Sequence, residues 1–197
     1  MYSYPLKIKN DGTPASNDIA ILDAEKNEVL FRPKITEAMV QGTEPCILFT
    51  DKATRQPIYN TLFQEKNGGE SFLIRTPGEV IMGELVGEAA HTWKVMDENG
   101  NPLATIQEKS SWKNSCLFQI LTFPLLIFSD TGLMDILLKM GAPHRYFVIL
   151  NGKKVLQLRE MVSTISDDYS LKKSGEFSER EEALLLVSLI TALGLKE

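Results

Sequence analysis

Apolar and polar residues alternate near the start of the chain. Over residues 2–9, Leu6 and Ile8 alternate with Lys7 and Lys9, and two tyrosines precede them at the same spacing. A period of two is typical of a β-strand with one buried side and one side that faces water. Pro5 has no amide hydrogen to donate, so we expect this strand to lie at a sheet edge or to pair on one side only.

Pairs of apolar runs separated by polar turns follow along most of the chain, and such pairs are typical of β-hairpins. The clearest turn is Asn151-Gly152, because this dipeptide tolerates positive φ at both central positions of a tight type I′ turn. The paired runs are 19–22 with 29–31, 46–49 with 57–59, 93–96 with 103–106, and 146–150 with 153–158. Further strands are expected at 73–74 and 79–86, broken by Pro77-Gly78.

The spacing of apolar residues changes near the C-terminal end from that of strands to that of a helix. Ser178 and Glu181 have the spacing of a capping box, in which both side chains accept hydrogen bonds from backbone amides at a helix start. The run 183–193 is apolar on every side, and Gly194 is placed to end the helix. The run spans only about 16 Å, against roughly 30 Å for a bilayer. We therefore expect a helix that is buried inside the β structure.

The segment 114–142 stands apart from this pattern. It begins with a strongly apolar stretch that contains Pro124, and a short amphipathic helix is expected after the break at residues 129–132. An exposed apolar patch here would serve as a contact for a protein partner or a membrane. The alternative is that these side chains complete the core. The candidate contact residues are Phe118, Phe123, Leu125, Leu126 and Phe128.

Three pieces in this order resemble the tubby-like superfamily, and within it the LURP-one-related and phospholipid scramblase-like proteins. They are the hairpin 93–106, the strand pair 146–155, and residues 168–171 followed by the apolar helix 181–193. The resemblance implies a mainly β fold, a closed antiparallel barrel of about 12 strands around a buried hydrophobic C-terminal helix. It implies one domain over 1–197, with 114–142 as an insertion or an altered connection.

Charge and targeting features narrow the class of protein. The net charge is −5, and no run of lysine and arginine exceeds two residues, so we expect no nucleic-acid partner. Cys46 and Cys116 form no metal or disulfide pattern and are expected to be reduced thiols. The first residues lack the features of a signal peptide. A cytoplasmic protein is expected, with peripheral membrane association as the alternative.

No catalytic, cofactor or metal site is predicted. Asp97, Asn99, Asn101 and Glu108 fit positions 1, 3, 5 and 12 of a calcium loop, but Pro102 stands where that loop needs glycine, so a hairpin turn is expected instead. His91 and His144 have no partner at metal-ligand spacing, and packing roles are expected for both.

The function expected from the sequence is a non-enzymatic binding or scaffold module of the tubby-like, LURP-one-related type. The alternative is a peripheral membrane or phospholipid-associated protein, by analogy with tubby and scramblase proteins. An enzyme with a site assembled only in space ranks third, because no catalytic motif supports it. The acidic net charge favours a protein partner over an anionic membrane.

Overall fold

The computed structural model describes residues 2–10, 19–23, 29–35, 47–51, 54–66, 69–89, 91–109, 144–161 and 168–194. In this part of the chain there are twelve strands and one helix, α3 (Glu179–Gly194). The strands are β1 (Leu6–Asn10), β2 (Ile19–Asp23), β3 (Val29–Ile35), β4 (Ile47–Asp51), β5 (Pro57–Lys66), β6 (Gly69–Arg75), β7 (Ile81–Ala89), β8 (Thr92–Asp97), β9 (Pro102–Lys109), β10 (Arg145–Leu150), β11 (Lys153–Glu160) and β12 (Tyr169–Lys173).

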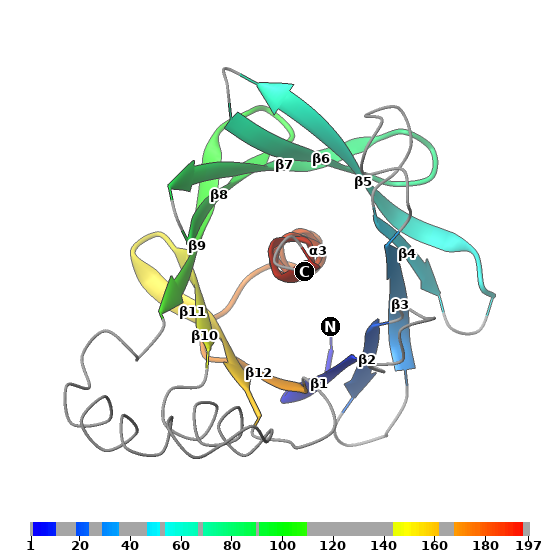
Figure 1. Ribbon diagram of the computed structural model, residues 1–197, viewed down its shortest axis with the longest axis vertical. Coiled ribbons are helices and arrows are strands. Elements are labelled where there is room, and N and C mark those ends of the chain that lie inside the picture. Colours follow the sequence, from blue (N-terminus) through cyan, green and yellow to red (C-terminus); the bar gives the residue numbers. More distant parts are fainter. Residues whose placement is uncertain are drawn as a thin grey trace, which may run out of the picture.

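The strands pair antiparallel in the order of a closed barrel. Each strand pairs with the next along the chain, and β1 pairs with β12 as well as with β2. Figure 1 shows the ring of strands from one end, with α3 inside it and also seen end-on. The prediction of a mainly β, antiparallel fold with a C-terminal helix is confirmed.

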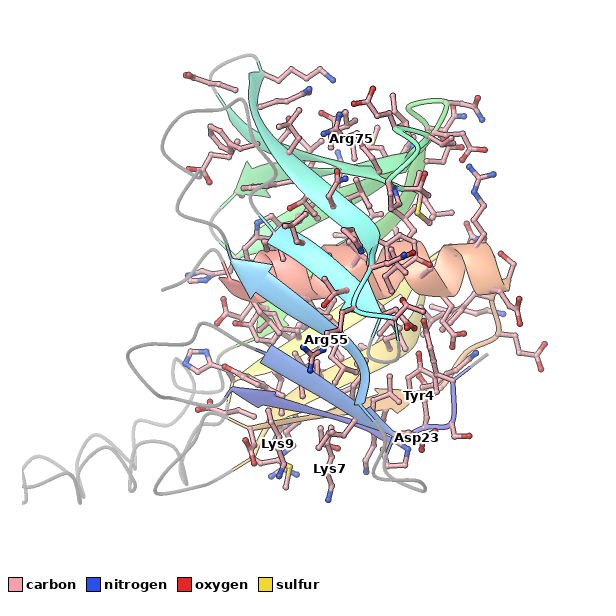
Figure 2. All side chains as sticks on the ribbon, turned by 90° about the vertical axis from the view of Figure 1, so that its right-hand side faces the viewer. Tyr4, Lys7, Lys9, Asp23, Arg55 and Arg75 are labelled. Carbon is pink, nitrogen blue, oxygen red and sulfur yellow. The ribbon has the colours of Figure 1, made fainter. Side chains whose placement is uncertain are left out.

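The helix α3 runs through the middle of the β structure (Figures 1 and 2). Leu185, Val187 and Leu189 are fully buried, and so is Thr191, whose hydroxyl donates a 2.8 Å hydrogen bond to the carbonyl oxygen of Val187. A helix surrounded by the inner faces of strands has no side that faces water, which explains why this segment has no polar stripe.

The start of α3 is fixed by the capping box that the sequence predicted. The backbone amide of Ser178 donates to the Glu181 carboxylate at 2.7 Å, and the Glu181 amide donates to the Ser178 hydroxyl oxygen at 3.3 Å. Glu179, Glu181 and Glu182 occupy the first turn, where negative charge offsets the positive end of the helix dipole.

The first strand confirms the alternation but corrects one expectation. Leu6 and Ile8 are buried while Lys7 and Lys9 are exposed. However, β1 is not an edge strand, since it pairs on both sides from Leu6 onward. Pro5 precedes the first paired residue, so its missing amide hydrogen removes no bond from the ladder.

All four predicted hairpins are present as neighbouring strand pairs. The two further strands expected on either side of Pro77-Gly78 are also present, and they pair as β6 and β7. At the tightest of them, φ is +50° at Asn151 and +75° at Gly152. Positive φ at both positions is the backbone of a type I′ turn, so this prediction is confirmed. The turn joins β10 to β11, and the pairing of these strands places Arg145 beside Arg159 on the outer surface.

The segment 114–142 lies outside the described residues, and with it the candidate contacts Phe118, Phe123, Leu125, Leu126 and Phe128. Their predicted role therefore stays a prediction. Within the residues that the structure does describe, no helix has the length and apolar character needed to cross a bilayer.

Candidate functional site

The outer faces of five adjacent strands, β9 to β12 and β1, carry basic side chains. Along each strand the side chains alternate, so that Leu156 and Leu158 of β11 are buried and Arg159 is exposed. At the outward positions of these strands, as far as the structure describes them, there is no aspartate or glutamate. The cations at these positions, called the basic face below, are Lys7, Lys9, Lys109, Arg145, Lys154, Arg159 and Lys172.

Part of the basic face forms a single row across the strands. Arg145 pairs in register with Lys109 of β9 on one side and with Arg159 of β11 on the other. Arg159 pairs with Ser170 of β12, which pairs with Lys7 of β1. Neighbouring strands lie about 4.8 Å apart, so the row crosses five strands at that spacing. Figure 2 shows Lys7 and Lys9 projecting away from the barrel at its outer surface.

A hollow of about 370 Å³ adjoins this row. The side chains of Arg159, Lys172, Ser170 and Gln157 all supply hydrogen-bond donors to it, and Met161 adds an apolar side chain that is 41% exposed. Glu160 also lines the hollow but is only 5% exposed. A hollow with cationic and neutral donors favours a ligand that offers oxygen acceptors with negative charge.

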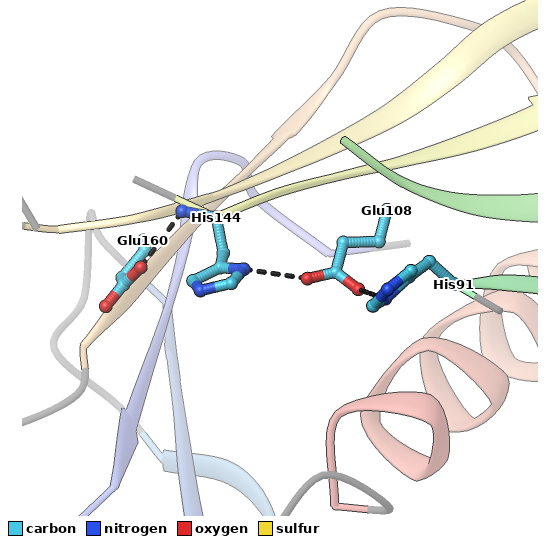
Figure 3. A network of polar contacts seen from close by, with 4 residues as sticks. All are labelled: His91, Glu108, His144 and Glu160. Atoms are coloured by element: carbon cyan, nitrogen blue, oxygen red, sulfur yellow. Dashed lines mark hydrogen bonds and ion pairs between the residues drawn. The ribbon is translucent and has the colours of Figure 1, made fainter. Parts of the chain in front are cut away.

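A polar network centred on the buried carboxylate of Glu108 lies at the ends of these strands (Figure 3). The two carboxylate oxygens of Glu108 accept hydrogen bonds from Nδ1 of His91 at 2.6 Å and from Nδ1 of His144 at 2.7 Å. The Glu108 side chain is 1% exposed, whereas those of His91 and His144 are 61% and 49% exposed. The backbone amide of His144 donates in turn to the Glu160 carboxylate at 2.9 Å.

The network and the row are built on the same strand ends. Glu108 precedes Lys109, His144 precedes Arg145, and Glu160 follows Arg159. Backbone hydrogen bonds reinforce this alignment, from the Glu108 amide to the His91 carbonyl at 2.9 Å and from the Glu160 amide to the His144 carbonyl at 3.0 Å. The network therefore holds in register the strand ends that carry these cations.

The geometry identifies the ring nitrogen that donates in both histidines. An ionised carboxylate only accepts hydrogen bonds, so each Nδ1 must carry the hydrogen. Tyr146 lies close to this network, and burial, together with the charge of Glu108, raises its pKa well above the ordinary value of 10.0.

The structure brings His91 and His144 together, which sequence spacing did not predict. The two rings are 17 and 36 residues from Glu108 along the chain. Glu88, the carboxylate nearest to His91 in sequence, forms an ion pair with Lys94 instead. Among the described residues, no group of three or more His, Cys, Asp or Glu side chains could hold a metal ion.

The calcium-loop residues form a turn, as the sequence predicted. The Asp97 carboxylate accepts hydrogen bonds from the backbone amides of Asn99 at 2.9 Å and Asn101 at 2.7 Å. These hydrogen bonds, of which the one from the Asn101 amide has the largest effect, hold the pKa of the Asp97 carboxyl below its ordinary value. The carboxylate thus stabilises the β8–β9 turn by accepting hydrogen bonds from its backbone amides.

Comparison with known proteins gives a match in fold. No family model and no curated protein matches the sequence. The X-ray structure of the Arabidopsis thaliana protein AT5G01750 is similar to this chain, with a TM-score of 0.52 and 12% sequence identity. The similarity covers 98% of this chain and 93% of the Arabidopsis protein. The comparison shows that the two chains share a fold.

Proposed function

We propose that the chain is a non-enzymatic binding or scaffold module of the tubby-like, LURP-one-related type, and that it holds a protein partner on its outer surface. The observation that carries this proposal is the position of α3. Its side chains, such as Leu186 and Ile190 at 1% and 0% exposure, fill the space inside the strands. The barrel interior is therefore occupied by the chain itself, and the outside is the surface that remains for a partner.

Two further observations support the family. The similarity in fold to the Arabidopsis protein extends over nearly the whole chain. The three sequence pieces that resemble the family become the β8–β9 hairpin, the β10–β11 hairpin, and β12 followed by α3. In the tubby-like fold, as in this chain, a hydrophobic helix follows the last strand.

A second candidate is the peripheral membrane or phospholipid-associated protein. The basic face favours it, because clustered lysine and arginine side chains attract anionic headgroups. The acidic net charge of the whole chain opposes it at long range. The first candidate places a protein partner on the basic face, and the second places an anionic membrane there.

Site-specific photo-crosslinking tests the first proposal. A photoreactive amino acid would replace Gln157, which points outward within the basic face, and in the control Lys66, on β5 across the ring from β11. In the cell of origin we expect a discrete protein adduct from position 157 and none from position 66. Absence of any protein adduct at 157 would contradict the proposal.

Co-sedimentation with vesicles tests the second candidate. The purified chain would be mixed with phosphatidylcholine vesicles and with vesicles that also contain phosphatidylserine. We expect the chain to remain in the supernatant in both cases. Sedimentation with the anionic vesicles alone, at physiological salt, would favour the phospholipid-associated function instead.

A further inference from the structure

We infer that the basic face binds an extended acidic segment of a protein partner, with carboxylates laid along the row Lys109, Arg145, Arg159 and Lys7 and an apolar side chain in the hollow beside it. This inference rests on the proposed function and specifies its partner. It depends on the charge of the face, the spacing of its cations, its curvature and the lining of the hollow.

In the part of the chain that the structure describes, cations of the basic face stand without carboxylate partners. Elsewhere on the barrel, Lys66 of β5 pairs with Glu84 at 3.0 Å, and Lys94 of β8 pairs with Glu88. Within the described residues, Lys7, Arg145 and Arg159 form no ion pair. Like charges on adjacent strands repel, so this arrangement is a cost to the fold that a bound anion would relieve.

The spacing of the row suits an extended chain. The first three cations of the row are on neighbouring strands, about 4.8 Å apart, and Lys7 follows two strands after Arg159. Alternate residues of an extended peptide lie about 6.7 Å apart. Lysine and arginine side chains are long enough to absorb this difference. Each arginine also presents a planar fork that can donate two parallel hydrogen bonds to one carboxylate.

The curvature of the face disfavours a flat membrane. One full turn divided among twelve strands gives about 30° per strand, so Lys109 on β9 and Lys7 on β1, four strands apart, point about 120° apart. A plane that touches the middle of the row leaves both outer cations directed sideways. A flexible peptide can follow the curve and meet all of them.

The face also lacks the features of a site for single-stranded nucleic acid. Such sites stack bases on exposed aromatic rings. The outward aromatic residue in this region, Phe147, is only 9% exposed, and the Lys154 ammonium lies 4.3 Å from its ring centroid. The ring is thus covered by a cation of the face itself.

The hollow indicates what else the partner should carry. Next to the donors Ser170 and Gln157 it exposes the flexible thioether side chain of Met161, which adapts to apolar groups of different shapes. An acidic segment with one leucine or phenylalanine among its carboxylates would satisfy both the row and the hollow.

Fluorescence anisotropy tests this inference directly. The probe is a fluorescein-labelled peptide of alternating glutamate and serine with a single central leucine. We expect saturable binding that weakens as salt is raised. In the double variant Arg159→Gln/Lys172→Gln, the dissociation constant should rise by about tenfold, because two charged donors are lost.

The matched control is Lys66→Gln/Arg180→Gln, which removes the same charge, one lysine and one arginine, from exposed positions outside the basic face. This control should change the dissociation constant by less than about twofold. Equal weakening in both double variants would overturn the inference, because it would show attraction by net charge alone. Far-UV circular dichroism of each variant verifies that the barrel is folded.

Competing ligands decide between the remaining outcomes. If oligo-dT or phosphatidylserine vesicles bind at the basic face and the acidic peptide does not, the inference is wrong. If no probe binds but the photoreactive residue at position 157 still yields a protein adduct, the inference fails while the proposed function stands. Loss of both signals would overturn both.

Discussion

Gly83 of β7 lies directly against Leu184 of α3, so closely that a Cβ atom at residue 83 would come within 3.0 Å of both δ-carbons of the leucine. The same Cβ would also collide with the carbonyl oxygen of Met96. The barrel wall thus approaches the helix more closely here than any side chain would allow.

Gly83→Ala should lower the free energy of unfolding by about 1–3 kcal/mol, because the added methyl group overpacks a contact that includes backbone. Urea titration at neutral pH measures this change. Gly87→Ala is the matched control on the same strand, where the new Cβ would lie 3.4 Å from the Glu70 carbonyl oxygen. An equal effect from the two substitutions would mean that the close approaches to Leu184 and to the Met96 carbonyl oxygen are not the cause.

Leu186→Ala should cost about 2–5 kcal/mol, because a buried leucine is replaced by a cavity inside the barrel. Leu186 is 1% exposed. Arg180→Ala, at a side chain that is 57% exposed and forms a surface pair with Glu98, should cost less than about 1 kcal/mol. Thermal or denaturant unfolding of both variants distinguishes a buried helix from a surface one.

The two histidines should be coupled through Glu108. Since each donates to the same buried carboxylate, His144→Ala should cost more in wild type than in the Glu108→Gln background, by about 0.5 kcal/mol or more. A double-mutant cycle in urea measures this difference. Side-chain ¹⁵N spectra at alkaline pH should show both rings with the hydrogen on Nδ1. Additive costs, or hydrogen on Nε2, would rule out the network.

Tyr146 should make the fold sensitive to alkaline pH. Burial raises its pKa, so the folded chain keeps the phenol protonated above pH 10, where the unfolded chain loses the proton. Its contribution is complete below pH 10 and is lost as pH rises further, at up to about 1.4 kcal/mol per pH unit. Tyr146→Phe should therefore flatten the dependence of unfolding free energy on pH above 10. An unchanged slope would contradict this assignment.

The hairpin turn offers a test free of packing effects. A Cβ at Gly152 would meet no atom within 4 Å, yet φ there is +75°. Gly152→Val should cost about 1–2 kcal/mol through backbone strain alone, whereas Asn151→Gly should be nearly neutral. Unchanged thermal stability in Gly152→Val would show that the turn adapts to a different conformation.

Local patterns predicted most of the fold. Alternation identified strands such as β1, the Ser178 and Glu181 pair identified the helix start, and Asn151-Gly152 identified the tightest turn. Each of these features depends on residues within a few positions of one another. The lack of a polar stripe in α3 even indicated that the helix is surrounded, because no other arrangement buries every side.

The candidate site could not be predicted in the same way, because it depends on register. Arg145 and Arg159 are solitary cations in sequence, and they become neighbours only when β10 pairs with β11. Glu108 meets His144 for a similar reason, across 36 residues. A sign was present nonetheless: the outward positions of these strands contain lysine and arginine but no carboxylate.

The position of α3 has a consequence for how the chain folds. The element that fills the barrel follows every strand in the sequence, and the ring closes only when Leu6 meets Leu171. Contacts so distant along the chain form slowly, because the entropy cost of closing a long loop comes before the contacts can stabilise the fold. During synthesis, the strands are therefore made before the helix that covers their inner apolar faces. A chaperone that shields these faces would matter most before α3 is made.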